Sequence, residues 1–416
     1  MFSDGGGSTL RSYRFLSLYL AAVLLVMAAL APAAASAGSP PPAPAGTPAA
    51  PPFRVNALGA VLLDARSGQV LFSQDGDKPL VPASLTKVMT LRLTFKAIKE
   101  GRIHLDDQVA IGPDAWAQKV GGSVMFLAPN TTVRLEELIK GITVDSGNDA
   151  CVAVADRLGG SADGFVAMMN EEARRLGLKN THYVDPNGLS SENHISPLDM
   201  ARLAQAYIRD YPDALTYHSI RSFTYGGIKQ DNRNGLLDTY PGADGLKTGY
   251  TDEAGYNLVA TAHRGDMRMI AVVMGVPGKG LTEAEVYKLR EDQAAKLLSY
   301  GFDSFADVEF KAGADLGRVP VYKGKASEVG LTLGQDVLVT VPRDDQGKLA
   351  KIVSPPAYLV APVARGQAVG EFKLSLPSGQ EILTAPLVAA QDVPRGGFFR
   401  VFWDSLKLLL KRLLHR

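Results

Sequence analysis

Three short strings in this sequence carry side chains suited to nucleophilic catalysis. They are Ser84-Leu85-Thr86-Lys87, Ser146-Gly147-Asn148 and Lys247-Thr248-Gly249, in that order along the 416-residue chain. A serine is a weak nucleophile until a base takes its proton. A lysine can be that base only when burial, a neighbouring cation or the positive end of a helix lowers its pKa. Together the strings indicate covalent chemistry at Ser84.

The first string gains meaning from its spacing. We predict a helix over Ser84–Lys99, ended by Gly101, in which Ser84 and Lys87 share one face. Pro82 lies just upstream and places Ser84 at the helix N-terminus. Alone, an S-x-x-K string arises by chance about one or two times in a chain this long. It therefore needs the other strings as support.

The second and third strings supply groups that such a reaction requires. The Ser146 hydroxyl can relay a proton, and the Asn148 amide can hold a substrate carbonyl or orient Lys87, although S-G-N alone also describes a plain turn. Gly249 on a strand would let a peptide backbone approach, with Lys247 and Thr248 facing a carboxylate. A chance K-T-G is expected only about 0.1 times per chain of this size. This ordered set is typical of penicillin-binding proteins and class A β-lactamases.

The elements around these strings predict an α/β (α+β) domain over residues 53–302 with a largely antiparallel sheet. We expect one hairpin from Val55–Asp64 and Gln69–Ser73, and a second from Tyr256–His263 and Met267–Met274. The other predicted helices are Leu135–Ile142, Ala150–Leu158, Ala162–Leu176, Pro197–Asp210 and Glu283–Leu298, the last leading into Gly301.

The chain changes character after the catalytic region. Residues 303–392 predict a small all-β domain, from short strand-like runs at Val337–Val341, Ala357–Val360, Ala368–Leu374 and Glu381–Ala385. Residues 396–416 predict an amphipathic helix, with a polar stripe of Arg400, Asp404, Lys407, Lys411 and His415 opposite aromatic and leucine side chains. Such a helix either packs on the protein's own core or binds a membrane surface; its terminal position favours the membrane.

The N-terminus has the pattern of an export signal. Arg11 and Arg14 precede an apolar core at residues 15–30, and Ala35-Ser36-Ala37 forms a small-residue cleavage site. The alternative is a transmembrane anchor, for which the apolar stretch is short. We therefore predict a signal peptide over residues 1–37, then a Pro/Ala-rich linker over 38–52. Export would place the activity outside the cytoplasm.

Composition excludes several classes of function. A net charge of +1 gives no reason to expect a nucleic-acid partner. The single cysteine, Cys151, rules out an internal disulfide and fits a buried small residue. The six histidines form no metal-binding string, so we expect no metal and no cofactor.

Longer strings extend the three motifs into a family resemblance. They are PASLTKVMT, SGNDACVAVA, DPNGL, NRNGLL and DGLKTGYTDEAGYNLVA, followed by the terminal amphipathic helix. From Val55 onward the chain resembles the low-molecular-mass penicillin-binding proteins, which are D-alanyl-D-alanine carboxypeptidases. The resemblance implies a penicillin-binding, β-lactamase-like catalytic fold. It also implies a peptidoglycan stem peptide as substrate, β-lactam antibiotics as covalent inhibitors, and a site on the outer face of the cytoplasmic membrane.

The resemblance also assigns roles to individual residues. Ser84 becomes the acyl-ester, Lys87 is its general base, and Ser146 and Asn148 shape the cleft and pass the proton to the leaving D-alanine. The N–H groups of Ser84 and Tyr250 would form the oxyanion hole. The remaining implied residues bind the terminal carboxylate: Lys247 and Thr248 of the K-T-G string, helped by Arg290, with Arg233 as a further cleft arginine.

Two departures and three competing functions remain open. Some relatives carry His where this chain has Tyr250, and Gly280–Leu289 contains extra residues before Arg290; each arginine could instead form an ion pair at the rim. A class A β-lactamase would need an E-x-x-L-N string, which is absent from this sequence. A transpeptidase would use an amine acceptor in place of water. A wall-binding scaffold with a vestigial cleft is disfavoured because every motif residue is present.

Overall fold

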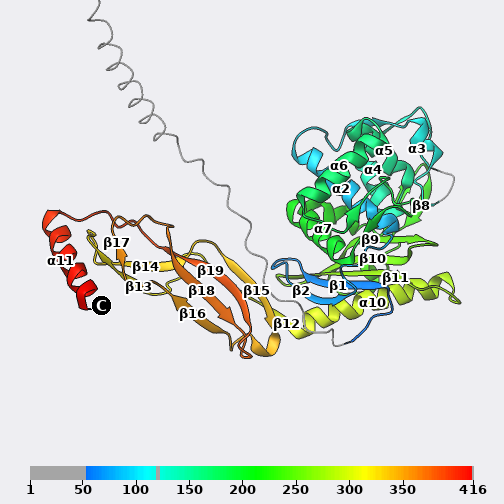
Figure 1. Ribbon diagram of the computed structural model, residues 1–416. Helices are drawn as coiled ribbons and strands as arrows, with labels where there is room; N and C mark the ends of the chain where they lie inside the picture. Colours follow the sequence, from blue (N-terminus) through cyan, green and yellow to red (C-terminus); the bar gives the residue numbers. More distant parts are fainter. Residues whose placement is uncertain (1–52, 119–121, 415–416) are drawn as a thin grey trace, which may run out of the picture. The chain divides into compact units, whose positions relative to one another are not determined.

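The computed structural model describes residues 53–118 and 122–414 (Figure 1). The predicted signal peptide, residues 1–37, and the predicted linker, 38–52, lie outside the described residues, as does His415. Within the described ranges, no helix is both long enough and apolar enough to cross a lipid bilayer.

A five-stranded antiparallel sheet forms the centre of the catalytic domain, with strand order β2-β1-β11-β10-β9. Its strands are β1 (Gly59–Asp64), β2 (Val70–Gln74), β9 (Ala243–Thr251), β10 (Gly255–Arg264) and β11 (Met267–Val276). Both predicted hairpins are therefore confirmed. The sheet joins strands from the two ends of the domain, because β1 pairs with β11 across the intervening helices.

Each face of the sheet is covered by helices, and alternation along the strands divides the core in two. Helix α10 (Glu283–Ser304) packs on one face through Ala294, Leu297 and Leu298, against Leu62 and other side chains of the sheet. Helices α2 (Lys87–Lys99) and α7 (Pro197–Asp210) cover the other face, which Val61 and its alternate neighbours present (Figure 1). The period of two in a strand produces this division.

The remaining helices and strands of this domain lie outside the five-stranded sheet. Its other helices are α3 (Pro113–Ala117), α4 (Leu135–Lys140), α5 (Asn148–Gly159), α6 (Ala162–Arg175), α8 (Leu215–His218) and α9 (Leu236–Thr239). Three two-stranded ribbons pair β3 (Gln108–Ala110) with β4 (Thr132–Arg134), β5 (Thr181–His182) with β6 (His194–Ile195), and β7 (Ser222–Tyr225) with β8 (Ile228–Asp231). The domain also contains a π-helical turn, Gly141–Asp145, and two 3₁₀ turns, Ala83–Thr86 and Pro212–Ala214.

The predicted end of α10 was wrong. The helix continues through Gly301 to Ser304, six residues beyond Leu298. A β-carbon at Gly301 would lie 3.0 Å from Leu62 Cδ2 and 3.0 Å from Met269 Sδ. The glycine therefore allows the helix to approach the sheet closely and does not end it.

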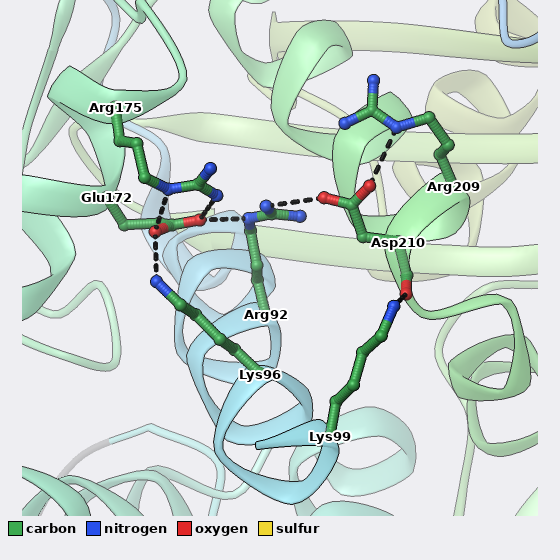
Figure 2. A network of polar contacts seen from close by, with 7 residues as sticks. All are labelled: Arg92, Lys96, Lys99, Glu172, Arg175, Arg209 and Asp210. Atoms are coloured by element: carbon green, nitrogen blue, oxygen red, sulfur yellow. Dashed lines mark hydrogen bonds and ion pairs between the residues drawn. The ribbon is translucent and has the colours of Figure 1, made fainter. Parts of the chain in front are cut away.

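Helix α2, which follows Ser84, is held by a buried charge network (Figure 2). Arg92, fully buried, contacts Glu172 of α6 at 2.8 Å and Asp210 of α7 at 2.8 Å. Glu172 also accepts hydrogen bonds from Lys96 and Arg175. The network joins α2 to α6 and α7 and so holds α2 in a fixed orientation.

The C-terminal region forms a β-rich domain, as predicted. Strand β12 (Phe305–Phe310) pairs with β15 (Val337–Pro342), and a second sheet has the order β16-β18-β19-β14-β13-β17. The strands of that sheet are β13 (Arg318–Tyr322), β14 (Glu328–Leu333), β16 (Ala350–Ser354), β17 (Leu359–Val360), β18 (Ala368–Ser375) and β19 (Glu381–Ala389), and a 3₁₀ turn spans Arg343–Asp345. Strand β17 is shorter than the predicted run from Ala357.

The terminal helix α11 (Phe398–Leu414) is amphipathic, as predicted, with one exception on its polar face. Asp404 is not part of an open polar stripe, because only 2% of it is exposed. Its Oδ2 accepts hydrogen bonds from the Lys323 N–H at 2.6 Å and from Arg400 Nε at 3.0 Å. Asp404 therefore attaches the helix to the β-rich domain. The apolar side chains remain exposed: Phe398, Phe399, Phe402, Trp403, Leu406, Leu409, Leu410, Leu413 and Leu414.

Candidate active site

Ser84 lies on a tight turn in front of α2. The segment Ala83–Thr86 is a 3₁₀ turn and α2 begins at Lys87, so the prediction of one α-helix from Ser84 was only partly right. In 3₁₀ geometry residues i and i+3 eclipse one another, which brings Lys87 directly over Ser84. Ala83 has φ +49°, a left-handed conformation uncommon for a residue with a side chain. The turn therefore holds the serine in a constrained position.

Two glycines allow neighbouring backbone to pack tightly against this turn. A β-carbon at Gly249 would lie 3.0 Å from the Ser84 nitrogen and 2.9 Å from the Pro82 oxygen. One at Gly188, where φ is +86°, would overlap the Ala83 carbonyl at 1.9 Å. The sequence predicted that Gly249 admits a substrate backbone; the backbone that approaches it here is that of the nucleophile turn itself.

A buried asparagine connects the segment that precedes Ser84 to the sheet. The Asn257 Nδ2 donates to the Val81 carbonyl at 3.1 Å and to the Pro82 carbonyl at 3.0 Å, and its Oδ1 accepts from the Gly275 N–H at 2.7 Å. Asn257 has no exposed surface. This amide joins β10 and β11 to the segment that leads into the catalytic turn.

Lys87 is the most fully coordinated group of the site. Its Nζ lies 2.8 Å from Ser84 Oγ, 2.7 Å from Asn148 Oδ1 and 2.7 Å from the Asn187 carbonyl oxygen. A neutral amine that donates to the two carbonyl oxygens turns its lone pair toward the serine hydroxyl. The arrangement can therefore take the Ser84 proton.

Burial favours the neutral form of the Lys87 amine. Lys87 is fully buried, and this desolvation lowers its pKa to about 8, even though Cys151 and Asp185 act in the opposite direction. Burial also lowers the pKa of Lys247 well below its ordinary value, and the nearby positive charges of Lys87, Arg233 and Arg290 add to that effect. The site thus gathers four cationic side chains in little space.

The loop that supplies the Asn187 carbonyl is fixed by an acid. The Asp185 carboxylate accepts hydrogen bonds from the N–H groups of Asn187 and Ser190, at 2.9 and 2.6 Å, and from that of Gly188. Such a pattern is an extended Asx turn. The string DPNGL contributed to the family resemblance, but the sequence analysis gave it no role at Lys87.

The string Ser146-Gly147-Asn148 links a π-helical turn to α5. Ser146 adopts the left-handed conformation, φ +61°, at the end of Gly141–Asp145, and Asn148 begins α5. The Asn148 N–H donates to the Ser123 carbonyl at 2.7 Å, while its side chain orients Lys87. Of the two roles foreseen for Asn148, the geometry supports orientation of the lysine.

A cleft of about 290 Å³ opens in front of Ser84. Ser146, Asn148, Thr248, Gly249, Tyr250, Arg233 and Arg290 line it with Ser84, whereas Lys247 is buried at its edge, with Nζ 3.1 Å from the Thr248 carbonyl oxygen. The three motifs therefore meet in one cleft, with both predicted arginines.

The two arginines form one connected pair. Arg233 Nη1 lies 2.5 Å from Ser123 Oγ, across the cleft mouth. Arg290 is 2% exposed, and its Nη2 donates to the Arg233 carbonyl at 2.7 Å and to Glu291 at 3.0 Å. Arg290 thus supports the Arg233 backbone and also forms an ion pair with Glu291.

Sequence reasoning missed Asn257, Asn187 and Ser123. Asn257 had one usable signal, an amide in a run of β-forming apolar residues, where asparagine is normally depleted. The Asp-Pro-Asn-Gly turn was visible, but its contact with Lys87 spans 100 residues. Ser123 carried no signal in its neighbourhood.

Comparison with known proteins gives the same result for both parts of the chain. A sequence profile described as D-alanyl-D-alanine carboxypeptidase matches residues 45–278, and one described as penicillin-binding protein 5, C-terminal domain, matches residues 309–395. The D-alanyl-D-alanine carboxypeptidase DacA of Escherichia coli K12 is 42% identical over 364 residues, covering 86% of this chain and 88% of the relative. The D-alanyl-D-alanine carboxypeptidase DacC of the same organism is 40% identical, and the match covers 85% of this chain and 88% of DacC.

Solved structures resemble the model to a similar extent. Penicillin-binding protein 5 from Haemophilus influenzae superposes with a TM-score of 0.76 at 39% identity, covering 83% of this chain and all of the other. Penicillin-binding protein D2 from Listeria monocytogenes, in its ampicillin-bound form, gives a TM-score of 0.51 at 31% identity, covering 61% and 99%. Similarity therefore extends over the cleft and the β-rich domain.

Proposed function

The chain belongs to the D-alanyl-D-alanine carboxypeptidase family and is a serine-type D-Ala-D-Ala carboxypeptidase; from this premise we propose the role of each side chain in its cleft. The observation that carries the proposal is the coordination of Lys87. Its buried Nζ lies 2.8 Å from Ser84 Oγ and donates to Asn148 Oδ1 and the Asn187 carbonyl. Ser84 is the nucleophile and Lys87 its general base.

Acylation follows from this geometry. Lys87 takes the Ser84 proton while Oγ bonds to the carbonyl carbon between the two D-alanines. The N–H groups of Ser84 and Tyr250, both at the cleft, stabilise the oxyanion. As the C–N bond breaks, Lys87 returns the proton it took from Ser84, and the Ser146 hydroxyl relays it to the leaving amine. A water then attacks the Ser84 ester and releases the shortened peptide.

The cationic end of the cleft recognises the terminal carboxylate. Thr248 offers a hydroxyl, Arg233 offers positive charge, and Lys247, buried at the edge of the cleft, offers an amine donor, while Gly249 leaves the strand edge open. Arg290 acts mainly by holding Arg233. β-Lactam antibiotics carry a carboxylate beside a strained amide, so they fill the same positions and acylate Ser84.

The decisive experiment locates the acyl group and follows the product. Purified protein treated with fluorescent penicillin should carry one adduct, which peptide mass spectrometry places on Ser84. The same protein should release free D-alanine from a pentapeptide that ends in D-Ala-D-Ala, whereas Ser84→Ala should lose nearly all activity. An adduct on Ser146 would overturn the assignment.

We also propose that the enzyme acts on the outer face of the cytoplasmic membrane, held there peripherally. Two features support this: the export-signal pattern of residues 1–37, and the exposed apolar face of α11. The peptidoglycan stem peptide would be available at this location, and trimming it is a step in cell-wall synthesis and remodelling.

A further inference from the structure

One wall of the cleft is built by the first turns of α10. Glu283, Tyr287 and Arg290 all line the cleft. Tyr287 follows Glu283 by four residues and Arg290 follows it by seven, so the three side chains lie on one face of the helix. The stretch Gly280–Leu289 forms these turns and the loop before them.

This wall is held in a fixed position. Thr282 and Glu285 form a capping box, in which the Glu285 carboxylate accepts from the Thr282 N–H at 2.8 Å. The Tyr287 ring packs edge-on against the Tyr256 ring, with 6.0 Å between the centroids. The Arg290 guanidinium lies 4.9 Å from the centroid of the Tyr287 ring. Tyr256 in turn stacks on Tyr250 at 4.2 Å. The helix end is therefore coupled to the strand that carries K-T-G.

Glu283 introduces the opposite charge into a cationic cleft. Its Oε1 accepts a hydrogen bond from the Tyr287 hydroxyl, and its other oxygen has no hydrogen-bond or ion-pair partner among residues 53–118 and 122–414. Of the described residues that line the cleft it is the only acid. The neighbouring Glu291 is already paired, with Arg290 and with the Gly235 N–H. Glu283 is exposed and available to a ligand.

Helix α10 sets the distance between the negative charge of Glu283 and the positive charge of Arg290. Seven residues at 1.5 Å each place Glu283 about 10 Å along the axis from Arg290, which holds Arg233. An extended peptide advances about 3.3 Å per residue, so about 10 Å corresponds to three residues. An extended substrate that runs along the first turns of α10, with its carboxylate at the cationic end, would therefore bring its third residue from the C-terminus to Glu283.

We propose that Glu283, oriented by Tyr287 on the first turns of α10, forms an anionic subsite for a protonated amine on the side chain of the third residue from the substrate's C-terminus. The inference rests on the proposed function, because it takes the terminal carboxylate to be bound near Arg233. It makes the cleft selective for a peptide that carries a C-terminal carboxylate and a positive charge on the side chain of the third residue from that end.

A pair of peptides tests the subsite. Nα-acetyl-L-Lys-D-Ala-D-Ala carries a free side-chain amine, and its Nα,Nε-diacetyl analogue does not. The wild-type protein should release D-alanine from the free amine with a kcat/KM about twofold to fivefold higher, the range for an exposed charge pair. Glu283→Gln should abolish this preference without slowing the diacetylated peptide, and Glu283→Lys should reverse it. The wild-type preference should shrink at high salt.

The controls separate the subsite from general effects. Glu253→Gln removes an equal charge from an exposed residue that does not line the cleft and should keep the wild-type preference. Penicillin acylation should be unchanged in every variant, which shows that the fold and Ser84 are intact. Equal kcat/KM for the two peptides in wild type, or an equal loss on both in Glu283→Gln, would overturn the subsite alone. No D-alanine release from either peptide would overturn the proposed function, and the subsite with it.

Discussion

At the scale of single residues, the chemistry depends on what surrounds Lys87. Three oxygen atoms within 2.8 Å would suit a charged ammonium, yet burial lowers the pKa of this amine to about 8. The neutral and protonated forms of the Lys87 amine are therefore close in free energy near neutral pH. A base in that balance can accept a proton and return it within one catalytic cycle.

This balance predicts the pH dependence of acylation. Because only the neutral amine accepts the Ser84 proton, the acylation rate should rise as pH increases through about 8 and then level off. Lys87→Arg cannot supply a neutral base, so acylation should fall by about 10²–10⁴-fold. Stopped-flow acylation with fluorescent penicillin from pH 6 to 10 measures both. Lys96→Arg on the same helix is the control, and a flat wild-type profile would contradict the role of Lys87.

Asn257 should matter for both stability and catalysis. Asn257→Leu leaves the Val81 carbonyl and the Gly275 N–H without a partner, and each unsatisfied group costs about 1–3 kcal/mol. The Pro82 carbonyl loses one bond but keeps the one from the Leu85 N–H. Acylation should also slow, because the Val81–Pro82 segment positions Ser84. The matched control is Gln74→Leu, which loses three similar bonds at the other edge of the sheet. Urea unfolding and acylation rates should show that both variants lose stability while only Asn257→Leu loses rate.

The sequence predicted the residues that meet in the cleft better than the groups that hold them in place. Ser84, Lys87 and Asn148 could be found because their types and order are unusual, and the structure brings them together in one cleft. Asn257 and the Asn187 carbonyl act through long-range contacts that no local pattern encodes. Gly249 was identified correctly as a point of close approach, but which backbone approaches it depends on tertiary packing.

At the scale of elements, α2 is positioned by charge as well as by apolar packing (Figure 2). Burial alone would raise the pKa of Glu172, but hydrogen bonds from Arg175, Lys96 and Arg92 outweigh it and lower the pKa to about 2. The carboxylate is therefore more acidic in the folded protein than its ordinary value of 4.5. Its ion pairs contribute stability only while it is ionised.

This depression predicts acid sensitivity. Stability from Glu172 should be complete above pH 4.5 and disappear as pH falls toward about 2, a change of about 3 kcal/mol. Glu172→Gln should remove this part of the pH dependence, whereas Glu171→Gln, which breaks an exposed ion pair, should change little. Urea unfolding followed by Trp116 fluorescence, with Trp403→Phe as background, reports the catalytic domain. Parallel acid curves for wild type and Glu172→Gln would contradict the assignment.

Elements were predictable where one pattern dominates. Both hairpins of the sheet follow alternation about a turn, and α11 follows its apolar face. Errors arose where a tertiary contact decided the outcome: Gly301 allows α10 to pass Leu62, and Asp404 is buried by the Lys323 N–H. Strands such as β12 were missed because a run like FADVEF is too short and mixed to separate from a loop.

At the scale of the whole molecule, the cleft and the exposed apolar helix face belong to different parts of the chain. Every residue that lines the cleft precedes Glu291, whereas the exposed apolar face lies on α11. Nine large apolar side chains exposed on one helix exceed the scattered exposure that is normal on a soluble surface. The cations Lys407, Lys411 and Arg412 accompany them, which matches an anionic lipid surface.

Membrane binding should therefore depend on α11 alone and have two components. Burying its apolar face contributes about 25 cal/mol per Å², which salt does not screen, and each cation near anionic lipid adds about 1 kcal/mol, which salt weakens. Leu409→Ser with Leu413→Ser, which lie on one face, should lose most vesicle co-sedimentation; Ile352→Ser, equally exposed on β16, should not. Lys407→Gln should weaken binding up to about fivefold, and only at low salt. Deleting residues 396–416 should release the protein from vesicles with unchanged D-alanine release, because the cleft lies wholly upstream; if activity fell with binding, α11 would be part of the catalytic fold instead of its attachment.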